Sequence, residues 1–164
     1  MGQNVIEPIG ADPTRVGDTT PIFKLGTRLR CNDGREFIYV LVGVGGALTG
    51  AGFIGVMNVE TYQILQATSA NTASKRGWLA GVAMGAMADS TYGWVQIFGP
   101  AQLQCLATVA AGVLVNTTVT AGAVDGTVAI GTRTIEGMAL TTARPASQGN
   151  AAANLIYPRI GITN

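Results

Sequence analysis

The stretch YGWVQIFGP at residues 92–100 constrains the fold more than any other segment of the chain. It places aromatic and β-branched residues between glycines and ends on a glycine–proline pair. This composition is typical of a short, heavily packed β-strand, and the closing pair predicts where the strand ends. The candidates for core or interface packing are Tyr92, Trp94, Ile97 and Phe98, together with Trp78 from an earlier segment.

Short strand-like blocks separated by turn signals recur along most of the chain. They are predicted at residues 36–42, 52–57, 77–84, 92–98, 102–107, 113–115, 119–124, 127–130, 132–143 and 153–158. Asp125-Gly126 is predicted to turn a hairpin, and Pro158 to close a final edge strand. Residues 58–65 fit either a short helix capped by Asn58 or another strand. The pattern predicts a mainly β fold, a small antiparallel β-barrel or sandwich, formed by residues 28–164 as one domain.

The first 27 residues have a different character. Residues 1–27 show neither the helical nor the strand period and are interrupted by Pro8, Pro13 and Pro21. They are predicted to form an extended N-terminal arm that lies on another surface. The apolar side chains that are candidates for anchoring the arm are Ile6, Ile9, Val16, Ile22 and Phe23.

Charge is scarce in this chain, with ten Lys and Arg and nine Asp and Glu among 164 residues. That is about half the usual share of charged residues. The surface must therefore be covered by uncharged polar residues or by other protein, and burial against copies of the same chain is the expected solution. A net charge of +1 without a basic stripe argues against nucleic acid as a partner.

The residues that catalysis most often uses are sparse. The absence of histidine excludes Ser-His and Cys-His nucleophile activation and imidazole zinc sites. The glycine cluster at residues 43–46 follows an apolar strand, but its spacing is not that of a dinucleotide fingerprint. We therefore expect no catalytic residue, no cofactor and no metal. A carbohydrate-binding module remains an alternative and requires an exposed Trp78 or Trp94.

Residues 37–59 carry no charge and are long enough to cross a membrane, yet they contain six glycines. Since each glycine disfavours a helix by about 1 kcal/mol relative to alanine, two strands around a glycine-rich turn are expected instead, and no membrane partner. The two cysteines, Cys31 and Cys105, are expected to be free thiols in a protein made in the cytoplasm.

Several of these blocks, taken in order, resemble the capsid decoration (cement) proteins of tailed bacteriophages. The resemblance covers roughly residues 26–160, and its most specific part is the Y-G-W-V-Q block at residues 92–96. The other blocks are E-F-I-Y-V at 36–40, G-V-A at 81–83, A-G-V-L at 111–114, I-E-G-M-A-L at 135–140 and L-I-Y-P-R-I at 155–160.

The resemblance implies a β-rich virion protein, commonly trimeric, on the outside of the phage head. Its implied partners are the major capsid protein and further copies of itself. The arm at residues 1–27 departs from the family pattern, and its scattered apolar side chains predict that it lies against the capsid or a neighbouring subunit. A tail-tube or tail-fibre component has the same style of composition and remains an alternative.

Overall fold

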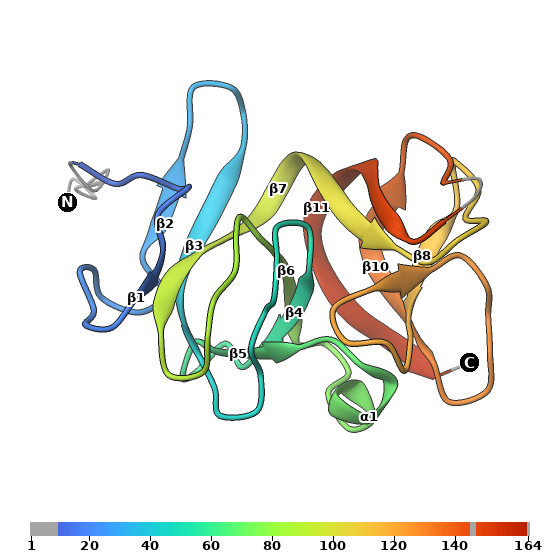
Figure 1. Cartoon of the computed structure of the whole chain (residues 1–164), viewed down its shortest axis with the longest axis horizontal. Coiled ribbons are helices and arrows are strands. Elements are labelled where there is room, and N and C mark those ends of the chain that lie inside the picture. The colour runs from blue at the N-terminus through green and yellow to red at the C-terminus, as the bar shows by residue number, and fades with distance from the viewer. Residues whose placement is uncertain (1–9, 145–146, 164) are drawn as a thin grey trace, which may run out of the picture.

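The computed structural model describes residues 10–144 and 147–163, which form a mainly β protein with two lobes side by side (Figure 1). The elements are β1 (Val16–Asp18), β2 (Arg28–Arg30), β3 (Glu36–Val42), β4 (Ile54–Met57), β5 (Gln63–Gln66), α1 (Ser69–Thr72), β6 (Leu79–Ala83), β7 (Tyr92–Cys105), β8 (Leu114–Thr117), β9 (Val124–Asp125), β10 (Arg133–Leu140) and β11 (Gly149–Thr163). The strands join in one 11-stranded sheet that bends around its cores. The predicted mainly β, barrel- or sandwich-like fold is confirmed.

Strand β7 runs through both lobes and connects them (Figure 1). Its first half, residues 92–98, pairs antiparallel with β3, and its second half, residues 98–105, pairs antiparallel with β11. β6 and the short β1 also pair with the first half of β7. We call residues 10–98 the N-terminal lobe and residues 99–163 the C-terminal lobe.

Three apolar clusters fill the protein. A distal core lies under β7, β10 and β11 and includes Leu103, Ile135 and Leu155. A central core includes Val40, Ile64 and Val95. An aromatic core lies at the end of the N-terminal lobe and consists of Leu29, Phe37, Tyr39 and Trp94.

The strands between the cores are apolar on both faces because both faces are covered. On β3, Ile38 and Val40 point into the central core, whereas Phe37 and Tyr39 point into the aromatic core. β4 and β6 separate the central and distal cores in the same way. Continuous apolar runs are the expected sequence of such doubly covered strands.

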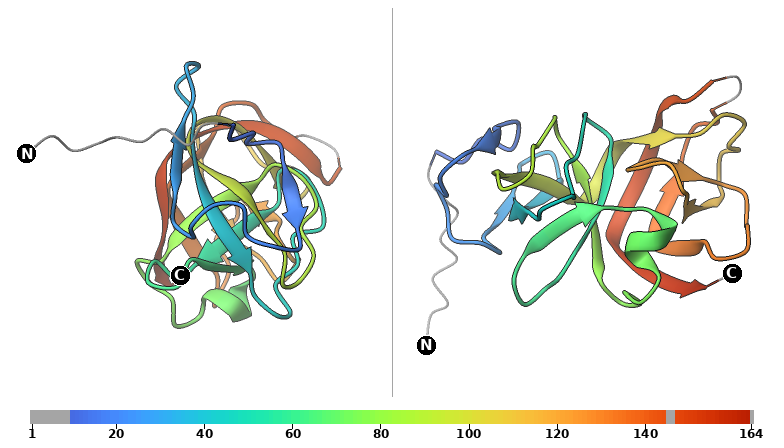
Figure 2. Two further views of the ribbon diagram at one scale, coloured as in Figure 1. Left: turned by 90° about the vertical axis from the view of Figure 1, so that its left-hand side faces the viewer. Right: turned by 60° about the horizontal axis from the view of Figure 1, so that its bottom comes forward.

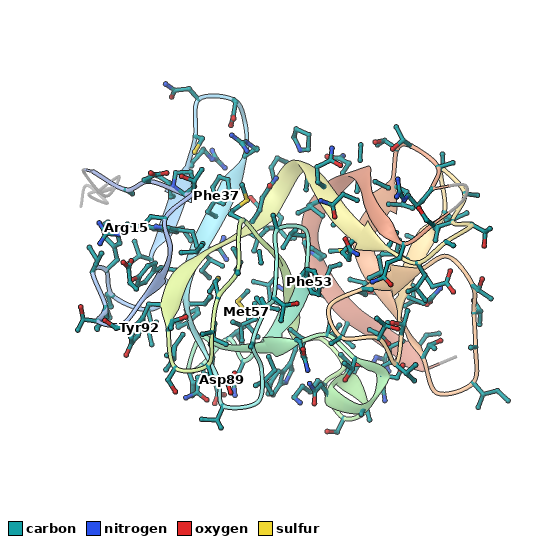
Figure 3. All side chains as sticks on the ribbon, viewed as in Figure 1. Arg15, Phe37, Phe53, Met57, Asp89 and Tyr92 are labelled. Atoms are coloured by element: carbon teal, nitrogen blue, oxygen red, sulfur yellow. The ribbon has the colours of Figure 1, made fainter. Side chains whose placement is uncertain are left out.

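The junction of the lobes is packed around Phe53, which Figure 3 shows between them. The Phe53 ring packs on the central core, and the loop at Gly122 lies directly against it. The amide of Ile54 donates to the carbonyl oxygen of Gly122 at 2.9 Å. The loop after β8 is thereby joined to β4.

Two predicted strand ends are wrong. β7 does not end at Gly99-Pro100, because Gly99 adopts a φ of +89° and lets the strand bend and continue as the partner of β11. β11 is not an edge strand closed by Pro158, since it runs on to Thr163 between β10 and β7. Across from β10, Glu136 pairs with Arg159 and Met138 with Leu155, so Pro158 lies in a bulge where its missing N–H breaks no ladder bond.

The hairpin predicted at Asp125-Gly126 is also wrong. Only residues 124–125 of the expected flanking strands form one, β9, and it pairs antiparallel with β8, the strand before it. Residues 127–130 form no strand. The open alternative at residues 58–65 is resolved as a turn followed by β5, and the helix α1 comes later.

The structure differs from the expected arm over residues 10–27. Val16 lies in β1, which pairs with β7 at Gly93, and its side chain packs on the central core. Phe23 packs on the aromatic core, and the amide of Ile22 donates to the Tyr39 hydroxyl at 3.2 Å. Figure 2 shows this segment wrapped over the end of the N-terminal lobe. These residues cover their own domain, because the open face of the aromatic core offers them an apolar surface.

Candidate binding surfaces

The predicted packing residues occupy different positions in the fold. Trp94 is buried in the aromatic core, with ring centroids 5.1 Å from Tyr39 and 5.3 Å from Phe23. Ile97 is buried in the central core. Tyr92 is half-buried and stacks on Tyr39. Trp94 therefore serves packing and is closed to a ligand at the surface.

The other two aromatic candidates are half-buried. Phe98 lies against the ring of Tyr157, with centroids 5.1 Å apart. Trp78 packs against the distal core, and the ammonium of Lys75 lies 5.2 Å from its ring centre. Trp78 is half-buried and Trp94 is buried, so neither is the exposed ring that the carbohydrate-binding alternative requires.

Among the candidates for the anchoring arm, Ile6 and Ile9 lie outside the described residues. Val16 packs against the central core and Phe23 against the aromatic core of the same chain. Ile22 is 45% exposed and is the one described candidate whose side chain an external partner can reach.

A charged cluster that sequence reasoning missed surrounds Glu36. Its carboxylate is buried, and it accepts hydrogen bonds from the Tyr157 hydroxyl at 2.8 Å and from Arg30 Nε at 2.6 Å. Arg28 adds a guanidinium 5.9 Å from the centre of the Tyr157 ring. Tyr157 holds a left-handed φ of +46°, inside the bulge of β11. Glu36 and Tyr157 are 121 residues apart, so no local pattern could have paired them.

The pKa of Glu36 records this environment. Burial acts to raise the pKa, but the hydrogen bonds from Tyr157 and Arg30 and the charges of Arg30 and Arg28 outweigh it and hold the pKa below its usual value. Such a carboxyl stabilises the fold at pH values above its unfolded pKa of about 4.3 and loses that contribution as the pH falls through the folded value.

We therefore expect Glu36→Gln to be less stable than the wild type at neutral pH, and the difference to shrink on acidification to about pH 3. Urea unfolding of both proteins across this range measures it. Asp12 and Asp33 also have lowered pKa values, through hydrogen bonds with Thr14 and Arg35 respectively. Both are present in the wild type and in the variant, so their contributions cancel in the difference between the two free energies of unfolding. An unchanged difference at low pH would contradict the assignment.

The surface most suited to protein contact is the distal patch, which consists of Val119 and Ile130 on loops of the C-terminal lobe; Val128 lies on the same loop as Ile130. Val119 is 90% exposed, Val128 is 64% exposed and Ile130 is fully exposed. Val119 and Ile130 line a pocket of about 290 Å³, whose walls are mainly threonine, alanine and glycine. Over residues 107–132 the single charged residue is Asp125. The sequence signal for this surface is the long threonine-, alanine- and glycine-rich tract, whose one charged residue is Asp125.

A larger cleft lies where β7 bends between the lobes. It has a volume of about 550 Å³ and is lined by small residues and by amide side chains from β7 and β11. The single charged residue in its lining is Arg35, which is paired with Asp33 at 2.7 Å. The cleft is therefore neutral.

The described residues provide no cluster of three or more His, Cys, Asp or Glu that could hold a metal ion. Within the same ranges, no helix is long and apolar enough to span a membrane. Neither Cys31 nor Cys105 forms a disulfide within the described part of the chain. Burial raises the pKa of the Cys105 thiol to about 11, so this thiol is protonated at neutral pH and is a poor nucleophile.

Comparison of the chain with protein-family models and with curated proteins found no match.

Proposed function

We propose that this chain is a virion structural protein, a capsid decoration (cement) protein that binds the outside of a tailed-phage head and stabilises the contacts between capsomers. The observation that carries the proposal is the distal patch, exposed apolar side chains beside a pocket, in a tract of chain (residues 107–132) whose one charged residue is Asp125. Exposed apolar surface of this kind marks a site of protein contact.

The segments that carry the family resemblance support the same proposal. Five of the six blocks lie on β3, β6, β7, β10 and β11, and the sixth leads into β8. The resemblance thus falls on the framework of the fold, and the distal patch lies on loops supported by that framework.

The proposed partners are the major capsid protein and further copies of this chain in a homotrimer. A decoration protein needs no chemistry of its own, because many modest contacts repeated over a symmetric shell add up to strong attachment. A surface poor in charge favours burial against protein in both kinds of contact.

The test is binding to undecorated heads of the cognate virus. We expect Ile130→Asp to weaken binding at least about tenfold, because a carboxylate is costly to bury in an apolar contact. Val44→Asp is the matched control, since Val44 is an apolar residue, 85% exposed, on a loop of the N-terminal lobe. Co-sedimentation with heads measures occupancy, and urea unfolding confirms that both variants are folded.

Two results would contradict different parts of the proposal. If the wild-type protein fails to bind heads, the proposed function is wrong. If the wild type binds and Ile130→Asp binds equally well, the function stands but the distal patch is not the contact.

A further inference from the structure

The neutral cleft at the bend of β7 contains a buried amide with a fixed orientation. Gln96 is only 2% exposed, and its Nε2 donates to the carbonyl oxygens of Phe98 at 3.0 Å and Pro100 at 2.8 Å. Carbonyl oxygens only accept hydrogen bonds, so these two partners establish which end of the amide is the nitrogen. The carbonyl end of Gln96 must therefore point the other way.

Within residues 10–144 and 147–163, no donor is hydrogen-bonded to Gln96 Oε1. The fully enclosed side-chain polar atoms without a partner in these ranges belong to Ser69 and Arg133, so Oε1 is not fully enclosed, and Gln96 is one of the residues that line the cleft. Such an acceptor on an otherwise buried side chain needs a donor from water or from a ligand. The cleft thus holds a hydrogen-bond acceptor fixed in its wall.

The rim of the cleft repeats this amide chemistry. Gln102 on β7 and Asn150 and Asn154 on β11 are exposed along two paired strands, where Gln102 lies opposite Ala152 and Asn154 opposite Pro100. Each amide side chain offers one acceptor and two N–H donors, the groups with which a peptide bond pairs. The side chains between them are small, which lets another backbone approach closely.

We infer that this cleft binds an extended, uncharged peptide segment with small side chains, contributed by a partner protein. The lining has no carboxylate for a cation, and the charge of its one guanidinium, Arg35, is partly neutralised by Asp33. A sugar would find no aromatic ring in the lining. Its volume of about 550 Å³ falls within the range of ligand sites. The inference concerns the ligand chemistry of the cleft and does not rest on the proposed role in the virion.

The probe is acetyl-trialanine amide, titrated into the full chain while the side-chain amide resonances are followed by NMR. Maltose and sodium acetate are the parallel titrations and represent a neutral hydroxyl ligand and an anion. We expect the tripeptide to shift the resonances of Gln96 and Asn154 saturably, and neither maltose nor acetate to do so.

Ala152→Trp, which fills the cleft, is expected to weaken tripeptide binding at least about tenfold. Gln102→Trp places the ring over the cleft from an exposed position, where folding is less affected. It is expected to weaken tripeptide binding in the same way and replaces Ala152→Trp if that variant does not fold. Ala110→Trp, at an exposed turn outside the lining, should bind like the wild type. The inference is overturned if maltose or acetate shifts these resonances instead, if no titration shifts them, or if filling the cleft leaves tripeptide binding unchanged.

Discussion

Replacing Trp94 by alanine is expected to lower the free energy of unfolding by about 3–5 kcal/mol, as truncation of a large buried aromatic does. Trp94 is 1% exposed, and its ring contacts Tyr39 on β3 and Phe23 on the N-terminal segment. The truncation therefore opens a cavity in the aromatic core, beneath Phe23 of the N-terminal segment. Urea or guanidinium unfolding gives the size of the loss.

Trp78→Ala is the control, because it removes the same side chain from a half-buried position. Its loss of stability should be clearly smaller. A Trp94→Ala protein as stable as the wild type would contradict the position of Trp94 in the aromatic core, and failure of that stable variant to bind a partner would mark Trp94 as an interface residue.

Gly137→Ala is expected to cost about 2–4 kcal/mol, from a left-handed backbone and a steric conflict together. Gly137 has a φ of +75° in the bulge between β10 and β11, and a Cβ there would lie 2.5 Å from the carbonyl oxygen of Ile156. Since that oxygen belongs to the backbone, a rotamer change cannot relieve the clash. Thermal or denaturant unfolding measures the cost.

Gly131→Ala separates the two contributions. Gly131 has a similar φ of +82°, but a Cβ there would meet no atom within 4 Å. We expect it to cost only the left-handed conformation, about 1–2 kcal/mol. If both variants lose the same stability, the close approach of β11 to Gly137 is not present in solution.

The fold could be predicted from the sequence where the local residue pattern alone identifies a strand. β3 has the predicted bounds, because its run of apolar residues is covered on both faces and bordered by turn residues. The predicted ends at Gly99-Pro100 and Pro158 failed for a common reason. Glycine and proline stop a strand by default, but a bend between partners or a bulge accommodates them, and only the paired strand decides which occurs.

The binding surfaces were less accessible to sequence reasoning than the fold. The pairing of Glu36 with Tyr157 depends on β3 and β11 meeting across β7. The orientation of Gln96 depends on carbonyl groups exposed by the bend at Gly99. The scattered apolar residues of the N-terminal segment indicated only that it would pack on another surface. They could not show that this surface is the aromatic core of the same chain, where Phe23 contacts Trp94.

The path of β7 also determines the order in which the protein can assemble during synthesis. When residues 92–98 are synthesised, their partner β3 has already been made. Residues 98–105 cannot pair with their partner until β11, which ends at Thr163, has been synthesised. Until that strand leaves the ribosome, the apolar face of the second half of β7 has no cover from it. Pairings across such long stretches of chain fold slowly, and an exposed strand edge is prone to association in the meantime. We therefore expect the nascent chain to be most prone to association in the interval between the synthesis of β7 and that of β11.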